Sequence, residues 1–336
     1  MSTDTRSPAS AFAHPAPEGF DGAQAKLHAL EENIRRVMVG KDEAIRMALV
    51  PLLCRGHLLI EDVPGIGKTT LAKSIARSLS AEFRRVQFTP DLLPLDITGS
   101  SIFNQKTGEF DFKQGPVFTN VLLADEINRA TPRTQSALLE CMEEFHVTVD
   151  GCTRRLPEVF FVVATLNPLE QSGTFPLPET QLDRFMLRLR LGYPSEAEEV
   201  QVFDRQAAVH PIETLRPALA ASDVVELAAV ARAVFVHPSL KEYAAKLTRA
   251  TRSHPDVVLG ASPRGTIGLI RTSQVLALAN RRPYVTPDDL KRLAPLVLGH
   301  RVVLKPQSQM RGLTDETVIR DVLAAVEVPI AADEVA

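Results

Sequence analysis

Little in this chain of 336 residues supports a disulfide framework, a membrane span or a strongly basic surface. Its three cysteines form no C-x-x-C pair and no metal-ligand spacing with the eight histidines, so we expect a reduced, cytoplasmic setting. No apolar run reaches about 18 residues, so we expect neither a transmembrane helix nor direct membrane insertion. The formal net charge is −3, and without a basic field non-specific nucleic-acid binding is not expected.

What remains is a composition typical of globular proteins, with 45% hydrophobic and 24% charged residues. The length allows two domains, each with its own hydrophobic core. Residues 1–22 are rich in Ser, Thr, Pro and Ala without an apolar centre, and we expect a flexible tail there. We place an α/β core at 23–194, an α-helical domain at 195–330 and a C-terminal tail at 331–336.

Strand and helix patterns alternate through the predicted core. The runs of strand length lie at 57–61, 85–88, 121–124, 159–166 and 186–191. Because the most apolar of these runs are separated by amphipathic helical segments, the pattern favours a parallel sheet covered by helices on both faces. Turn signals at Gly108 and Gly151 add two predicted β-hairpins, at 100–112 and 147–156.

Beyond a Gly-Tyr-Pro-Ser boundary at 192–195, no comparable buried strand occurs and the pattern becomes helical. The predicted helices are 196–209, 222–234, 239–254, 264–280, 287–298 and 314–326. Ser195, Thr286 and Thr314 precede three of them and have the chemistry of helix N-caps. We find no internal repeat.

The most informative stretch follows the first apolar strand, where a glycine-rich turn opens a helix. Its predicted phosphate-binding residues are Pro64, Gly65, Ile66, Gly67, Lys68, Thr69 and Thr70. Glycines allow the backbone N–H groups to point at phosphate oxygens, Lys68 adds a full positive charge, and the Thr69 hydroxyl is a ligand for Mg²⁺. The strict P-loop pattern has glycine where this chain has Asp62, but that position lies at the strand exit, before the phosphate contacts.

Two acids end the second fully apolar strand, at Asp125 and Glu126. Ligands bind at the carboxyl edge of open α/β sheets, so we expect Asp125 to hold Mg²⁺, directly or through water, and Glu126 to polarise the attacking water. Without the P-loop, the pair would be interpreted as solvated acids at the end of a strand. The P-loop upstream favours the metal-binding interpretation.

Three further residues are candidates for a role in hydrolysis. Asn167 follows another buried strand, where a neutral amide can orient water beside the γ-phosphate, although Asn-Pro alone indicates a turn. Arg184 follows a short helix that begins at Pro178, and an arginine reaching a neighbouring subunit's γ-phosphate stabilises transition-state charge. Arg264 opens a helix of the second domain. In isolation, each arginine reads as a surface ion-pair former.

Together these motifs resemble the AAA+ ATPases, specifically the MoxR family, over about residues 27–304. The resemblance rests on EDVPGIGKT at 61–69, ADEINRA at 124–130, GTFPLPETQLDRF at 173–185 and GASPR at 260–264. It implies a sheet of order 5-1-4-3-2, an α-helical lid, and a hexameric ring with nucleotide between subunits. The two hairpins resemble the pore-facing hairpins of this group.

The resemblance also implies a role for each matching position. It casts Lys68 as the Walker A lysine, Asp125 and Glu126 as Walker B, Asn167 as sensor 1, Arg184 as the arginine finger, Arg264 as sensor 2, and Val39 and Gly40 as adenine contacts. Arg129 is a second candidate for the trans-acting arginine, and the sequence does not separate it from Arg184. Two departures, Leu166 and Thr180, leave hydrolysis intact.

The function that these resemblances imply is Mg²⁺-dependent ATP hydrolysis that remodels or matures a protein client. Expected partners are further copies of the chain, a protein with a von Willebrand factor A domain, and clients that include metalloenzymes. A nucleic-acid motor is one alternative, with Arg154 and Arg155 of the second hairpin as basic contacts. Against it, the first hairpin carries acidic as well as basic residues, and no aromatic residue is interleaved with the two arginines for base stacking. A weakly hydrolysing, nucleotide-gated scaffold is another.

Overall fold

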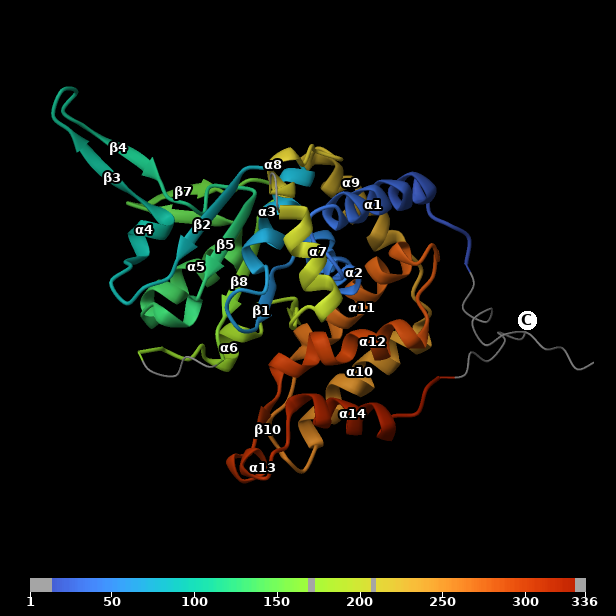
Figure 1. Ribbon diagram of the computed structural model, residues 1–336. Coiled ribbons are helices and arrows are strands. Elements are labelled where there is room, and N and C mark those ends of the chain that lie inside the picture. The colour runs from blue at the N-terminus through green and yellow to red at the C-terminus, as the bar shows by residue number, and fades with distance from the viewer. Residues whose placement is uncertain (1–13, 169–172, 207–209, 330–336) are drawn as a thin grey trace, which may run out of the picture. The chain divides into compact units, whose positions relative to one another are not determined.

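The computed structural model describes residues 14–168, 173–206 and 210–329 (Figure 1). The chain divides into two compact units. Residues 28–225 form the first, and the described residues 14–27 and 226–329 belong to the second. Helices α1 (Phe20–Arg35) and α9 (Ala221–Ala233) run from one unit into the other. The domain limits drawn from the sequence at 22, 194 and 330 stay predictions.

A parallel five-stranded sheet forms the centre of the first unit. Its strands, in spatial order, are β2 (Phe83–Gln87), β5 (Val121–Asp125), β8 (Phe161–Leu166), β1 (Leu58–Glu61) and β9 (Leu187–Leu189). Counted along the chain within this sheet, the order is 5-1-4-3-2 read from β9, which confirms the expected topology. Gln87 pairs with Asp125 in register, so β2 and β5 end side by side at the carboxyl edge.

Both faces of this sheet are buried, as the uniformly apolar strand sequences predict. Helix α5 (Pro132–Glu144) packs on the face that includes Leu122 and Val162. Helices α2 (Asp42–Leu53) and α3 (Lys68–Ser78) also contact the sheet, and Figure 1 shows helices on both of its sides. The core of the unit is therefore a helix–sheet–helix sandwich that fixes the carboxyl edge.

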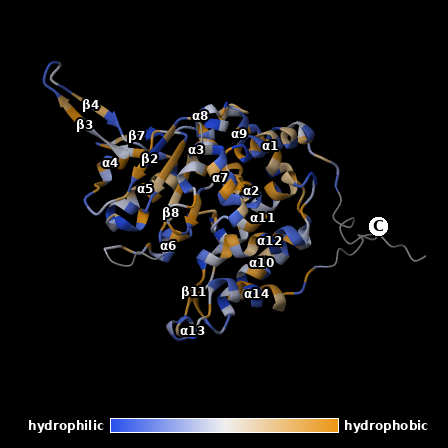
Figure 2. Cartoon of the chain, in the orientation of Figure 1, coloured by the Kyte–Doolittle hydropathy of each residue, from blue (hydrophilic) through white to orange (hydrophobic). Residues whose placement is uncertain are grey.

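Two antiparallel hairpins extend from the first unit, as the turn signals predict. They are formed by β3 (Gly99–Asn104) with β4 (Glu109–Gln114), and by β6 (His146–Val149) with β7 (Cys152–Arg155). Figure 2 shows hydrophobic colouring on part of both strands of the first hairpin, where Phe103 and Phe110 pair with ring centroids 5.3 Å apart. Their exposed fractions are 51% and 71%.

Short elements connect these parts of the first unit. They are α4 (Pro94–Thr98), the 3₁₀ turn η2 (Ile127–Arg129), α6 (Glu179–Leu182), α7 (Glu196–Gln206) and α8 (Pro211–Thr214). Helix α6 matches the short helix expected before Arg184, and Pro178 is its N-cap residue.

The second unit is built mainly from helices that pack against one another. They are α10 (Pro238–Ser253), α11 (Pro263–Ala279), α12 (Pro287–Leu298), α13 (Pro306–Met310) and α14 (Asp315–Ala325), with the 3₁₀ turn η3 (Gly299–Arg301). The capping box of Thr286 with Asp289, and the Thr314 cap on the Thr317 N–H, confirm two predicted helix starts. A two-stranded ribbon of β10 (Val257–Leu259) and β11 (Val303–Leu304), too short for a periodic signal, is added to the expected helical fold.

Within the described ranges, no helix has the length and apolar character needed to cross a membrane.

Candidate nucleotide site

The P-loop joins β1 to α3 through two glycines in left-handed conformations. Gly65 has φ +85° and Gly67 has φ +94°, and Gly67 is the N-cap of α3. Side chains other than glycine rarely adopt these angles, so the local fold depends on glycine at both positions. The turn leaves the N-terminal N–H groups of α3 available for an anion.

Lys68 starts α3 with its side chain directed back at the loop. Its ammonium donates a hydrogen bond of 2.6 Å to the Asp62 carbonyl, and the residue is 9% exposed. Burial lowers the pKa of Lys68, while the nearby carboxylates of Asp125, Asp62 and Glu126 oppose the shift. A lysine held in this way is a positive charge fixed at the phosphate position.

The carboxyl end of β5 brings Asp125 and Glu126 to the same place. Thr165, on the neighbouring strand β8, donates a 2.6 Å hydrogen bond to Asp125 Oδ1 and accepts one of 2.8 Å from the Glu126 N–H. Glu126 has φ +56°, a left-handed conformation that is uncommon outside glycine. The Thr165 hydroxyl therefore holds the Asp125 carboxylate and the Glu126 backbone, a role that sequence reasoning missed.

Two residues of the edge strand β2 donate hydrogen bonds to these acids. Sequence reasoning also missed both of them. The Arg85 guanidinium donates to Asp125 Oδ2 at 2.7 and 3.2 Å, and the Gln87 amide donates to Glu126 Oε2 at 2.7 Å. Arg85 and Gln87 are two residues apart and therefore lie on one face of β2. This pattern was the available signal in the sequence, because the expected sheet order already placed this strand beside β5.

These groups line one cavity of about 390 Å³. Its lining residues are Pro64, Gly65, Gly67, Lys68, Thr69, Thr70, Arg85, Gln87, Asp125 and Glu126. Of the eight distinct P-loop and Mg²⁺ candidates drawn from the sequence, seven line this cavity at one edge of the sheet, together with Glu126. The eighth candidate, Ile66, is buried beside them.

Comparison with known proteins decides the family. A model described as "ATPase family associated with various cellular activities (AAA)" matches residues 57–187, and an AAA lid domain model matches residues 249–322. The protein named Chaperone MoxR1 of Mycobacterium tuberculosis is 42% identical over 94% of this chain and 87% of its own length. This chain belongs to the MoxR family of AAA+ ATPases.

Two further relatives cover nearly the whole of this MoxR-family chain. The Bacillus subtilis protein named Uncharacterized protein YeaC is 51% identical over 91% of this chain and 97% of its own. A crystal structure from Cytophaga hutchinsonii, provisionally called an ATPase, is 37% identical with a TM-score of 0.87 over 93% of this chain and 97% of the other. The α/β core with an α-helical lid and the assignment as an ATPase are thereby confirmed.

In this MoxR-family ATPase, Asp62 points away from the phosphate side of the loop. Its Oδ2 accepts hydrogen bonds of 2.8 Å from the N–H groups of both Leu191 and Gly192, and its Oδ1 accepts one from Val63. The aspartate that replaces the pattern glycine thus ties the base of the P-loop to the segment after β9. Its position outside the phosphate contacts agrees with the sequence interpretation.

The loop that contains Val39 and Gly40 lies against the P-loop. A Cβ added to Gly67 would lie 3.5 Å from the Met38 methyl group, and Gly40, with φ +67°, has the Glu198 carboxylate packed on it. Lys41 then donates to the carbonyls of Leu191, Gly192 and Tyr193 at 3.0–3.1 Å. Residues 191–193 are therefore held by Lys41 through their carbonyls and by Asp62 through N–H groups, and we name this arrangement the 191–193 clamp.

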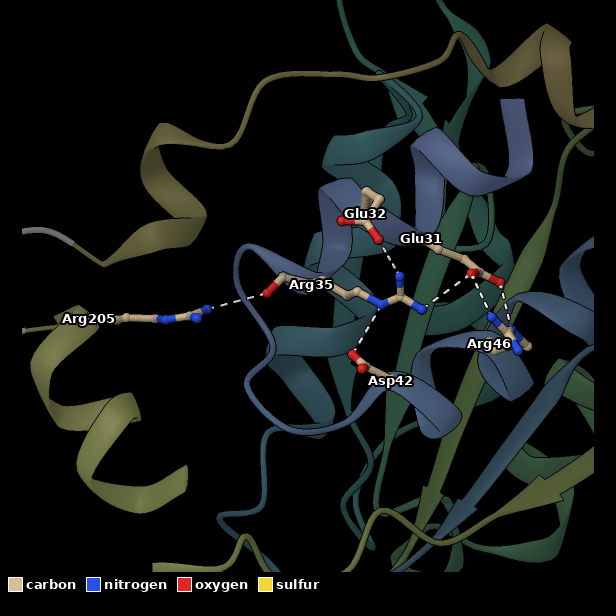
Figure 3. A network of polar contacts seen from close by, with 6 residues as sticks. All are labelled: Glu31, Glu32, Arg35, Asp42, Arg46 and Arg205. Atoms are coloured by element: carbon tan, nitrogen blue, oxygen red, sulfur yellow. Dashed lines mark hydrogen bonds and ion pairs between the residues drawn. The ribbon is translucent and has the colours of Figure 1, made fainter. Parts of the chain in front are cut away.

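An ion-pair network anchors the same loop from the side of α1 and α2 (Figure 3). Glu31, whose side chain is 4% exposed, pairs with Arg46 at 3.1 Å and with Arg35 at 3.4 Å. The Glu31 hydrogen bond is the main cause that raises the pKa of Arg46. Arg35 also pairs with Asp42 across the loop, and Arg205 of α7 donates to the Arg35 carbonyl at 3.4 Å.

The remaining candidates do not line the cavity. Asn167 is 5% exposed and directly follows β8, beside β1 in the sheet. Arg184 pairs with Glu143 at 3.1 Å, whereas Arg129 pairs with Glu126 of the same chain at 2.8 Å. Arg264 belongs to the second unit, in the first turn of α11, so its role at the nucleotide stays a prediction.

Proposed function

We propose that the cavity between the P-loop and β5 binds ATP with Mg²⁺ and hydrolyses it. The observation that carries this proposal is the meeting of Lys68, Thr69, Asp125 and Glu126 around one cavity of about 390 Å³. One carboxylate and one hydroxyl suit Mg²⁺, which proteins usually bind through one or two carboxylates together with substrate phosphates. Within the described residues, no cluster of three or more His, Cys, Asp or Glu side chains competes as a metal site.

Thr69 and Asp125 would hold the metal, which when bound neutralises charge on the β- and γ-phosphates. The P-loop N–H groups and Lys68 position the triphosphate. Glu126 accepts a proton from the attacking water, and the Asn167 amide orients that water without adding charge. Val39 and Gly40 contact the adenine, since their loop lies against Gly67.

Arg184 is our candidate for the arginine that reaches a neighbouring subunit's nucleotide. Its own carboxylate partner, Glu143, lies outside the cavity, while the alternative, Arg129, is engaged by Glu126 of its own chain. The proposal requires a ring of identical chains, and a hexamer is the expected size. Arg264 would join the lid to the nucleotide.

We further propose that hydrolysis remodels a protein client, with a von Willebrand factor A domain protein as adaptor and metalloenzymes among the clients, in a cytoplasmic setting. The exposed pair Phe103 and Phe110 supports a hairpin that touches protein. A nucleic-acid motor is less well supported, because the Arg154 guanidinium packs 3.9 Å from the Phe112 ring centroid and is partly covered within the chain.

The test is steady-state ATP hydrolysis with and without Mg²⁺, for wild type and Lys68→Ala, with the oligomer mass followed by light scattering. We expect turnover only with Mg²⁺ and only in the wild type, together with assembly on ATP. Mixing Lys68→Ala with Arg184→Ala subunits examines the trans arginine, since mixed rings regain turnover only if the arginine acts on a neighbour. Nucleotide binding without turnover or assembly would favour the scaffold instead.

A further inference from the structure

Two nitrogens of the Arg85 guanidinium donate hydrogen bonds to the carboxylate proposed to hold the metal. Its Nη2 and Nε lie 2.7 and 3.2 Å from Asp125 Oδ2. The two partners differ in exposure, since the side chain of Arg85 is 48% exposed and that of Asp125 is 14% exposed. The arginine is the more exposed partner of this pair, and it lies on β2, the edge strand of the sheet.

Both oxygens of the Asp125 carboxylate already accept hydrogen bonds, and one lone pair, on Oδ1, is left over. Oδ1 accepts the Thr165 hydroxyl at 2.6 Å, and Oδ2 accepts both Arg85 N–H groups. A magnesium ion requires oxygen lone pairs at about 2.0–2.1 Å in near-octahedral geometry. A guanidinium at hydrogen-bond distance from the same carboxylate would repel the metal, so the two cations compete for Asp125.

We propose that Arg85 is the resident counterion of Asp125 and that Mg²⁺ displaces it when nucleotide binds. This inference rests on the proposed function of the site. Because the Arg85 side chain is about half exposed, its guanidinium withdraws into water at a small cost. Arg85 thereby sets the Mg²⁺ concentration at which the site accepts its nucleotide.

The displacement has a second consequence through Gln87. Arg85 Nη2 donates to Gln87 Oε1 at 2.9 Å, and the Gln87 amide in turn holds Glu126 Oε2 at 2.7 Å. When Arg85 leaves, Gln87 loses its donor and is held less firmly against Glu126 Oε2, which Arg129 still contacts at 2.8 Å. Occupancy of the metal position is thus linked to the acid that polarises the attacking water.

The test measures how much Mg²⁺ is needed for a fluorescent, non-hydrolysable ATP analogue to bind the full chain. Arg85→Ala should lower the Mg²⁺ concentration for half-maximal binding by about two- to fivefold, the effect of one partly screened ion pair. Arg85→Lys, which keeps the charge, should stay nearer to wild type. The matched control is Arg84→Ala, which removes the next arginine of the same strand and its pair with Glu82.

Each outcome decides the proposal. A lowered Mg²⁺ requirement in Arg85→Ala alone supports it, and melting curves of the same samples should show a larger stabilisation by Mg²⁺ in that variant. An unchanged requirement, or one that rises because Arg85 assists the nucleotide, overturns it while leaving the proposed function standing. Failure of the wild type to bind the analogue at any Mg²⁺ concentration would overturn the proposed function itself, and this inference with it.

Discussion

The two halves of the proposed nucleotide site are built in different ways. On the phosphate side, Gly65, Gly67 and Lys68 follow one another in the chain, and their geometry comes from a single turn. On the other side, Lys41 reaches the carbonyls of residues 191–193, about 150 positions away along the chain. Asp62 belongs to both halves, since it directly follows β1 at the start of the P-loop and completes the 191–193 clamp.

The difference teaches where sequence patterns carry information. Phosphate chemistry needs particular residue types at fixed spacing, so a local pattern reports it. The clamp needs only a charged donor and a carboxylate at the right points in space, which many sequences satisfy. We therefore expect substitutions on the phosphate side to change turnover, and substitutions in the clamp to change stability and affinity.

Among substitutions outside the proposed catalytic and phosphate-binding residues, Thr165→Val should have the largest effect on turnover. It removes the hydroxyl that bonds both Asp125 and the Glu126 N–H, yet keeps the shape of the side chain. We expect ATP turnover to fall by about 10- to 100-fold, as misplacement of catalytic groups produces. Thr248→Val, which removes a buried hydroxyl that donates to a helix carbonyl in the second unit, is the control for stability. Equal turnover in both variants would contradict the role of Thr165.

Asp62→Gly restores the strict P-loop pattern and should nevertheless harm the protein. The N–H groups of Leu191 and Gly192 lose their acceptor, so the free energy of unfolding should fall by about 1–3 kcal/mol. Asp62→Asn keeps an acceptor oxygen and should lose less. Urea denaturation gives the stability, and titration with an ATP analogue gives the affinity. A glycine variant as stable as wild type would show that the clamp contributes nothing.

The contribution of His57 to the pH dependence of stability does not depend on either half of the site. Burial lowers its pKa to about 4, against the opposing hydrogen bond to the Met142 carbonyl. The unfolded chain takes up this proton near pH 6.5, so stability from this group is complete above that pH and is lost as the pH falls toward 4. The slope should approach about 1.4 kcal/mol per pH unit. His57→Gln should flatten the pH dependence of urea midpoints, and an unchanged curve would be evidence against the assignment.

Lys41→Met should give the smallest effect. Its three carbonyl partners lie in part-buried to exposed surroundings and regain water when the ammonium is removed. We expect a loss of about 0.5–1.5 kcal/mol in stability and a modest weakening of nucleotide affinity, with turnover at saturating ATP unchanged. A fall in saturated turnover as large as that of Thr165→Val would break the distinction between the two halves.

Much of this organisation was predictable, and the remainder has physical reasons. Apolar strand runs separated by amphipathic helices indicated the sheet, and the resemblance supplied its order. The roles of Arg85, Gln87 and Thr165 were missed because each depends on the register between neighbouring strands, which the sheet order alone does not give. The Glu31 network was missed because an acid in a helix reads as solvated until its two arginine partners are seen.

The most direct measurement compares ATP binding and ATP turnover in one preparation of Glu126→Gln. The account predicts that nucleotide affinity stays near wild type, because the phosphate contacts are intact. Turnover should fall by about 100-fold or more, since the general base is lost. Unchanged turnover in this variant, with binding retained, would contradict the assignment of hydrolysis to the carboxyl edge of β5.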